Sequence, residues 1–157
     1  MNRKRGFEIC TGKGKAPEGS IIKLPRRSTR LSAGYDFFAP YDIDLMPNEY
    51  LKIDTGIKAY MQAGEVLLAF PRSSLGFKYF CRMANTVGVI DADYYNNPDN
   101  EGAIGIELRN EGLMPMHVEA GKAIAQFIFV PFLLADGDDF ESGTDRVGGF
   151  GSTDKVQ

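Results

Sequence analysis

One stretch of this 157-residue sequence decides the fold class: Ala123-Ile124-Ala125-Gln126-Phe127-Ile128-Phe129-Val130. It is the longest of several runs that the sequence predicts as β-strands with the two-residue side-chain period. Gln126 shares a face with Ile124 and Ile128 inside this apolar run, so its amide needs a polar partner. A phosphate, a neighbouring chain or the protein backbone could supply that partner.

Shorter runs with alternating apolar and polar residues indicate further strands. They cover residues 51–53, 57–60 and 104–109. Turn-forming residues separate the runs at short intervals, at Pro47-Asn48, Ala63-Gly64, 96–100 and Glu111-Gly112. This spacing is typical of a β-sandwich or barrel, so we expect an all-β fold.

One short helix is expected after Pro71. Either Ser73 or Ser74 can cap its first free amides. Apolar and basic residues then continue at helical spacing, at Leu75, Lys78, Tyr79 and Arg82.

The composition excludes several classes of protein. With 43% apolar residues, the chain can bury a core and has the size of one domain. It has no apolar run long enough for a membrane span and no signal-like N-terminus, so we expect a cytoplasmic location. Cys10 and Cys81 are far apart, which predicts buried free thiols rather than a disulfide or zinc site. Because His117 is the only histidine, carboxylates must carry most proton chemistry.

The charge is unevenly distributed. Residues 1–30 hold nine Lys and Arg against two Glu, whereas the remainder holds nine against nineteen Asp and Glu. The acidic body would repel a polyanion, so no nucleic-acid partner is expected. Core-forming residues run out after Phe132. We therefore expect a β domain over residues 1–135 and an acidic linker with a flexible Gly-rich C-terminal arm over residues 136–157.

Four segments carry polar groups that are not required to form the predicted strands. The tail 146–153 has backbone amides, two hydroxyls and a cation suited to phosphate, although a glycine tail alone is more often a linker. Segment 71–76 places an arginine and two serines where anions bind or where a serine simply caps the helix. Segment 85–94 resembles a β-hairpin with an acidic lip, in which Asp91 is a candidate base or an ordinary turn residue. The fourth segment, 32–36, is a small-residue turn that ends in a carboxylate.

Taken in order, these segments resemble the five motifs of the trimeric deoxyuridine triphosphatases (dUTPases). The matching segments are Ala33-Gly34-Tyr35-Asp36, Pro71-Arg72-Ser73-Ser74-Leu75, Asn85 with Gly88-Val89-Ile90-Asp91-Ala92-Asp93-Tyr94, Ile124-Ala125-Gln126-Phe127-Ile128-Phe129, and Gly148-Gly149-Phe150-Gly151-Ser152-Thr153. The resemblance implies a distorted jelly-roll barrel and a homotrimer. Its active sites would lie between subunits, each closed by the C-terminal arm of a neighbour.

The resemblance also implies a reaction: hydrolysis of dUTP to dUMP and pyrophosphate by water attack on the α-phosphorus, with Mg²⁺ bridging the triphosphate. This reaction limits uracil incorporation into DNA and supplies dUMP for dTMP synthesis. By this resemblance Asp91 would polarise the water, Tyr94 would pack beneath the deoxyribose, and Phe150 would stack on uracil. The other implied roles are base reading by Asn85 and the backbone of Gly88, Val89 and Ile90, phosphate binding by Arg72, Ser73, Ser74, Gln126, Arg146, Gly151, Ser152 and Thr153, and metal binding through water by Asp36.

The sequence departs from the family pattern at several positions. Ala123 stands where an arginine is usual, and Arg146 lies one residue closer to Phe150 than usual. The segment Tyr95–Asn100 intervenes between the hairpin tyrosine and the Glu-Gly pair that normally follows it.

Two other functions remain open at this stage. Glu107 stands where the related dCTP deaminases keep their catalytic glutamate, so a deaminase or a bifunctional enzyme is one alternative. Against this, Phe77 replaces a deaminase arginine, and strand alternation places Glu107 opposite Ile106 and Leu108, where a solvated or subunit-facing carboxylate is expected. A noncatalytic nucleotide-sensing interaction module is the second alternative.

Overall fold

The computed structural model describes residues 3–138, and the structural statements below concern this part of the chain. Twelve strands dominate it, which confirms the all-β prediction. The elements are β1 (Gly6–Ile9), β2 (Arg26–Arg27), β3 (Tyr35–Phe38), β4 (Ile43–Leu45), β5 (Tyr50–Asp54), β6 (Ile57–Tyr60), β7 (Glu65–Pro71), α1 (Ser73–Tyr79), β8 (Cys81–Met83), β9 (Gly88–Asp91), the 3-10 turn η1 (Ala92–Tyr94), β10 (Gly105–Asn110), β11 (Met116–Val118) and β12 (Ala123–Pro131).

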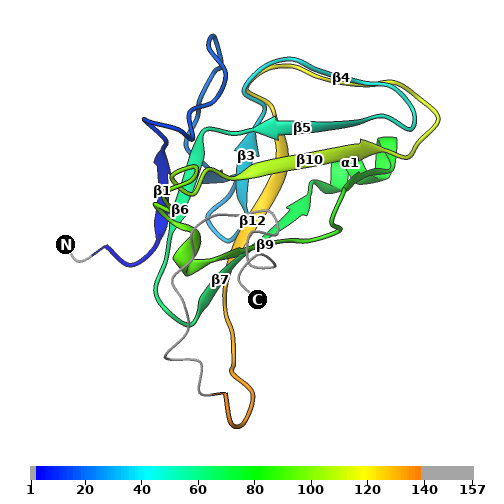
Figure 1. Cartoon of the computed structure of the whole chain (residues 1–157). Coiled ribbons are helices and arrows are strands. Elements are labelled where there is room, and N and C mark those ends of the chain that lie inside the picture. The colour runs from blue at the N-terminus through cyan, green and yellow to red at the C-terminus, as the bar shows by residue number, and fades with distance from the viewer. Residues whose placement is uncertain (1–2, 139–157) are drawn as a thin grey trace.

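The strands of residues 3–138 form four antiparallel sheets. The largest has the order β2-β3-β12-β7-β9, the next has the order β5-β10-β8, and two pairs, β1-β6 and β11-β4, complete the set. In Figure 1, β12 and β7 run through the middle of the molecule, β5 and β10 cross above them, and β4 follows the upper rim.

The predicted strand at residues 123–130 is the centre of the five-stranded sheet, because β12 pairs with β3 on one side and β7 on the other. Its side chains alternate between two faces. Phe127, Ala69 and Phe37 lie on what we call the inner face and are buried. Gln126 and Asp36 lie opposite each other in register on the outer face.

The core lies between the inner face and the β5-β10-β8 sheet. Ile53, Ile106 and Leu108 contribute fully buried side chains from the latter. From the inner face, the rings of Phe37 and Phe127 stack with centroids 3.9 Å apart. Each buried side chain of this size stabilises the fold by about 1.5–3 kcal/mol. This core holds the two sheets that carry the candidate site residues.

The helix differs from its prediction at both ends. The residue at the N-cap is Arg72, whose side chain makes no capping bond, so the predicted serine cap is wrong. The amides of Leu75 and Gly76 instead donate to the Arg72 carbonyl. Phe80 adopts a left-handed conformation (φ 52°) that ends the helix, and Arg82 therefore belongs to β8 rather than to the helix.

The segment predicted as a hairpin does not form one. β8 pairs with β10, whereas β9 pairs with β7 in the other large sheet. Residues 84–87 connect them through a turn in which the Thr86 amide donates to the Met83 carbonyl. The two strands therefore diverge instead of pairing with each other.

Both cysteines are buried and free, as predicted. Burial raises the pKa of the Cys10 and Cys81 thiols to about 11. No helix in the described part of the chain is long and apolar enough to span a membrane.

Candidate active site

A pocket of about 430 Å³ lies where β8 and β9 diverge. We call it the inner pocket, because Ala69, Gly88, Ile90 and Phe127 line it from the inner face of the five-stranded sheet. The polar side chains among its lining residues are Lys52, Asn85 and Glu107. An apolar cavity of this size with a few polar groups is typical of a small-molecule site.

Backbone groups also face this space. β9 is the last strand of the five-stranded sheet and β8 is the last strand of the three-stranded sheet. Each therefore has a row of N–H and C=O groups that no strand of residues 3–138 pairs with. A Cβ atom at Gly88 would lie only 2.9 Å from the Ala69 Cβ, so a larger residue there would push β9 away from β7.

The residues predicted to read a base are brought together in part. Asn85 and the inward-facing Gly88 and Ile90 line the inner pocket, whereas the Val89 side chain points to the outer face and is 62% exposed. Only the backbone of Val89 is therefore placed for the predicted role.

Asp91 ends β9 at the rim of the inner pocket. It lies opposite Val66 in register, which places its half-buried side chain on the outer face. Tyr94 follows in η1 and is 8% exposed; it is not among the residues that line the pocket. Its hydroxyl donates to the Ala103 carbonyl at 3.0 Å. Asp91 thus lies beside the pocket, while Tyr94 is fixed in the next loop.

A second group of polar side chains, which we call the outer cluster, consists of Ser28, Asp36, Arg72 and Gln126. The Arg72 Nε lies 3.5 Å from Asp36 Oδ1, and the Ser28 hydroxyl donates to Asp36 Oδ2 at 2.5 Å. The Gln126 amide donates to the Pro71 carbonyl at 3.4 Å, so the backbone supplies its partner. The structure therefore brings Asp36 of β3, Gln126 of β12 and Arg72, which lies between β7 and α1, together.

The outer cluster offers donors suited to an anion. Besides the Arg72 guanidinium and the Gln126 amide, Ser73 and Ser74 lie exposed at the start of α1. Charge-assisted hydrogen bonds from such groups are the usual means of binding phosphate oxygens.

The same cluster holds one carboxylate suited to a hard cation. No group of three or more His, Cys, Asp and Glu within residues 3–138 could hold a metal ion on its own. Mg²⁺, however, usually keeps several waters and takes one or two carboxylates plus substrate phosphates. The Asp36 carboxylate, with 13% of its side chain exposed, fits that limited role.

One chain does not bring the inner pocket and the outer cluster to one place. The pocket opens from the inner face, whereas the cluster lies on the outer face. Asp91 and Gln126 are separated by strand β7 and by the four-residue offset between their partners Val66 and Phe70. With standard strand dimensions this places their Cα atoms about 16 Å apart.

Sequence reasoning missed Lys52 and Ser28, and it named Glu107 without placing it in the inner pocket. Glu107 faces away from Ile106 and Leu108 as the alternation predicts, but it is half-buried and lines the inner pocket rather than standing in solvent. Lys52 lies opposite it in register on β5, and Ser28 supports Asp36. None of these contacts has a local sequence signal, because each depends on which strands pair.

Several predicted site residues lie outside the described residues. These are Arg146, Phe150, Gly151, Ser152 and Thr153 of the C-terminal segment. Their roles, and the arm itself, stay predictions.

Comparison with known proteins gives a consistent result. The dUTPase family profile matches residues 21–154. The deoxyuridine 5'-triphosphate nucleotidohydrolase of Lactococcus lactis subsp. lactis is 48% identical over 149 residues, covering 95% of this chain and 97% of that protein. The crystal structure of dUTPase from Streptococcus mutans is 41% identical with a TM-score of 0.70, over 84% of this chain and 99% of that one.

A more distant structure shows the same fold. A mutant dUTPase from phage phi11 of S. aureus, in which a structural Mg(II) ion is coordinated, is 20% identical with a TM-score of 0.67. The match covers 88% of this chain and 97% of the phage protein. The predicted dUTPase-like fold is thereby confirmed.

Proposed function

Because this chain belongs to the dUTPase family, we propose that it hydrolyses dUTP to dUMP and pyrophosphate. The observation that carries this proposal is the inner pocket, where two sheet edges and Asn85 surround an apolar space and Asp91 follows the lining residue Ile90 at the end of β9. The alternatives of a deaminase and a noncatalytic sensor receive no comparable support from the family match.

In this proposal the base is read by the Asn85 side chain and by the backbone of β9. The Asn85 amide and the unpaired backbone groups of β9 present donors and acceptors to the uracil edge. A base with a mismatched edge leaves these groups unpaired in a desolvated pocket, which costs about 1–3 kcal/mol for each group. The preference for uracil therefore follows from the divergence of β8 and β9.

Asp91 acts as the general base. It follows directly on the strand that holds the nucleoside, so its carboxylate lies where the chain passes from base to phosphate. It accepts a proton from the attacking water as the water approaches the α-phosphorus. General-base catalysis of this kind accelerates a reaction by about 10²–10⁴-fold.

The outer cluster binds the triphosphate. Arg72, Ser73, Ser74 and Gln126 donate hydrogen bonds to its oxygens, and Asp36 keeps the guanidinium of Arg72 oriented. Asp36 would also hold Mg²⁺ through water; the ion, when bound, supplies positive charge that offsets charge building up on the phosphates. These donors stabilise the transition state because they are already in place.

The site is completed by other copies of the chain. A nucleotide whose base lies in the inner pocket reaches Asp91 but not the outer cluster of the same chain, about 16 Å away on the sheet. A second copy of the chain that places its outer cluster beside this pocket would supply the missing phosphate donors, which supports the homotrimer.

The C-terminal arm closes the site in the same proposal. Phe150 lies nineteen positions after Pro131, with eighteen residues between them. An extended chain of that length spans at most about 65 Å. Phe150 can therefore stack on a uracil in a neighbouring subunit, while Arg146, Ser152 and Thr153 bind the terminal phosphate.

The test is pyrophosphate release with dUTP, dTTP, UTP and dCTP in the presence of magnesium. We expect release from dUTP to exceed that from the other three nucleotides by about 100-fold or more. Ammonia release from dCTP is measured in the same samples. Equal use of the four nucleotides, or ammonia without pyrophosphate, would contradict the proposal.

A further inference from the structure

The six-residue insertion Tyr95–Asn100 follows directly on Tyr94. We propose that Asn97 and Asn100 of this insertion are positioning residues that hold the Tyr94 ring rigid and thereby set the preference for dUTP over UTP. The inference rests on the proposed function, in which Tyr94 lies beneath the deoxyribose.

The hydroxyl end of the Tyr94 ring has two partners. The hydroxyl donates to the Ala103 carbonyl at 3.0 Å and accepts from Asn100 Nδ2 at 2.8 Å. Because Tyr94 is 8% exposed, little water competes for these bonds. One donor and one acceptor together fix the far end of the ring.

The backbone end of Tyr94 belongs to the same network. Asn97 is buried, and its Nδ2 donates to the Tyr94 carbonyl at 2.9 Å and to Asn100 Oδ1 at 2.8 Å. Its Oδ1 accepts from the backbone amides of Asp99 and Asn100. The insertion therefore holds Tyr94 at both ends through two asparagines that contact each other.

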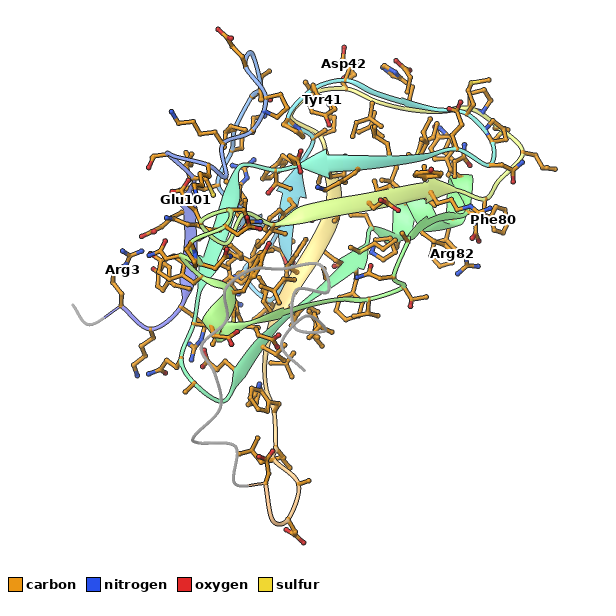
Figure 2. The ribbon with its side chains drawn as sticks, viewed as in Figure 1. Arg3, Tyr41, Asp42, Phe80, Arg82 and Glu101 are labelled. Carbon is orange, nitrogen blue, oxygen red and sulfur yellow. The ribbon has the colours of Figure 1, made fainter. Side chains whose placement is uncertain are left out.

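The insertion is itself anchored to the N-terminal part of the chain. The carboxylate of Glu101 accepts from the backbone amides of Gly12 at 2.6 Å and Gly14 at 3.1 Å, and lies 3.5 Å from Lys58 Nζ. Figure 2 shows Glu101 on the side of the molecule that carries β1 and β6. The network around Tyr94 is thus tied to the rest of the fold rather than standing alone on a loop.

Rigidity matters here because UTP differs from dUTP by one added hydroxyl. An apolar wall rejects an analogue with an extra hydroxyl only about 100-fold. If the Tyr94 ring moves away from the sugar, the larger ribose of UTP fits as well. A displacement of about 1 Å is enough to change a rate by about 100-fold. Hydrogen bonds that hold the Tyr94 ring in place therefore affect the discrimination between deoxyribose and ribose, although the two asparagines do not contact the substrate.

The experiment compares kcat/KM for dUTP and UTP in matched variants. Asn100→Asp keeps the Oδ1 acceptor for Asn97 but replaces the donor to the Tyr94 hydroxyl by an acceptor, so the single hydroxyl proton can no longer satisfy both Ala103 and residue 100; Asn100→Ala removes both groups. We expect the dUTP-to-UTP ratio of kcat/KM to fall about three- to tenfold, the effect of one neutral hydrogen bond, chiefly through faster turnover of UTP. Asp99→Ala is the control, because it removes an exposed side chain from the same loop and should leave the ratio unchanged.

A double-mutant cycle separates positioning from a general structural role. Tyr94→Phe should lower the ratio to a similar extent, and Asn100→Asp in the Tyr94→Phe background should lower it no further. The inference is overturned by an unchanged ratio in Asn100→Asp, by an equal fall in kcat/KM for both nucleotides, or by additive effects in the cycle. A wild-type protein that does not hydrolyse dUTP would instead refute the proposed function itself. If Asn100→Ala does not fold, Asn100→Asp decides.

Discussion

The outer cluster and the inner pocket are built in opposite ways on the two faces of one sheet. In the outer cluster, charged and polar side chains satisfy one another: Ser28 donates to Asp36, which pairs with Arg72. The inner pocket depends instead on apolar walls and on the edges of β8 and β9, which no other strand of residues 3–138 pairs with. In the proposed mechanism each chain therefore contributes two half-sites, one organised by charge and one by shape, and a single nucleotide uses the two half-sites of different chains.

Mixed trimers give the most direct test of whether the inner pocket and the outer cluster of one site come from different chains. Asp91→Asn should lower kcat by about 10²–10⁴-fold while nucleotide binding persists, because an amide cannot accept the proton. Arg72→Ala should also inactivate the enzyme, by removing a phosphate donor. If the two residues act from different chains, mixed trimers of these variants regain about a third of the wild-type sites, since one of the three ordered subunit contacts is intact.

The measurement is dUTP turnover by trimers purified through two different tags. Trimers of each variant alone provide the background, and doubly tagged wild-type trimers provide the full activity. No recovery in mixed trimers would place Asp91 and Arg72 in one site of one chain.

A smaller effect is expected from the polar wall of the inner pocket. Glu107→Ala removes a half-buried lining side chain, so KM for dUTP should rise about tenfold while kcat changes little, because Asp91 and the phosphate donors are untouched. Steady-state kinetics separates the two constants. Arg109→Ala, an exposed position on the same strand, is the matched control; an equal rise in KM there would remove the specific role of Glu107.

The smallest effect concerns the two thiols. Burial raises their pKa from an ordinary value of 9.0 to about 11. The folded state therefore keeps these protons longer than the unfolded state, so the resulting stability is full below about pH 9 and is lost as the pH rises towards 11.

Labelling with a thiol reagent at pH 8 measures this directly. We expect slow labelling of both cysteines in the folded protein and fast labelling after denaturation. Excess dUMP should slow labelling at Cys81, whose strand β8 also carries the pocket-lining Met83, more than at Cys10. Fast labelling in the folded protein would contradict the burial of these groups.

Local sequence patterns predicted the strands well and their pairing less well. The period-two alternation at residues 123–130 identified β12 because one face of that strand is core. The supposed hairpin was wrong because β8 and β9 find partners elsewhere along the chain, in β10 and β7. Nothing in a short turn such as 84–87 reports those distant partners.

The same distinction holds for the candidate site. Asp36, Arg72 and Gln126 were named from their segments, and the structure brings them together across three adjacent elements. Glu107 was expected to be solvated or to face another subunit, since alternation shows which face a side chain takes but not what covers that face. The end of α1 at Phe80 was missed because left-handed backbone is uncommon at an aromatic residue.

The edges of β8 and β9 also bear on which surfaces of the protein could pair with another polypeptide. Unpaired strand edges are templates on which a second polypeptide can add, and proteins normally cover or charge them. A nucleotide bound between the two strands would cover both edges at once. Ligand binding at this place would therefore change how much strand edge is exposed to other polypeptides.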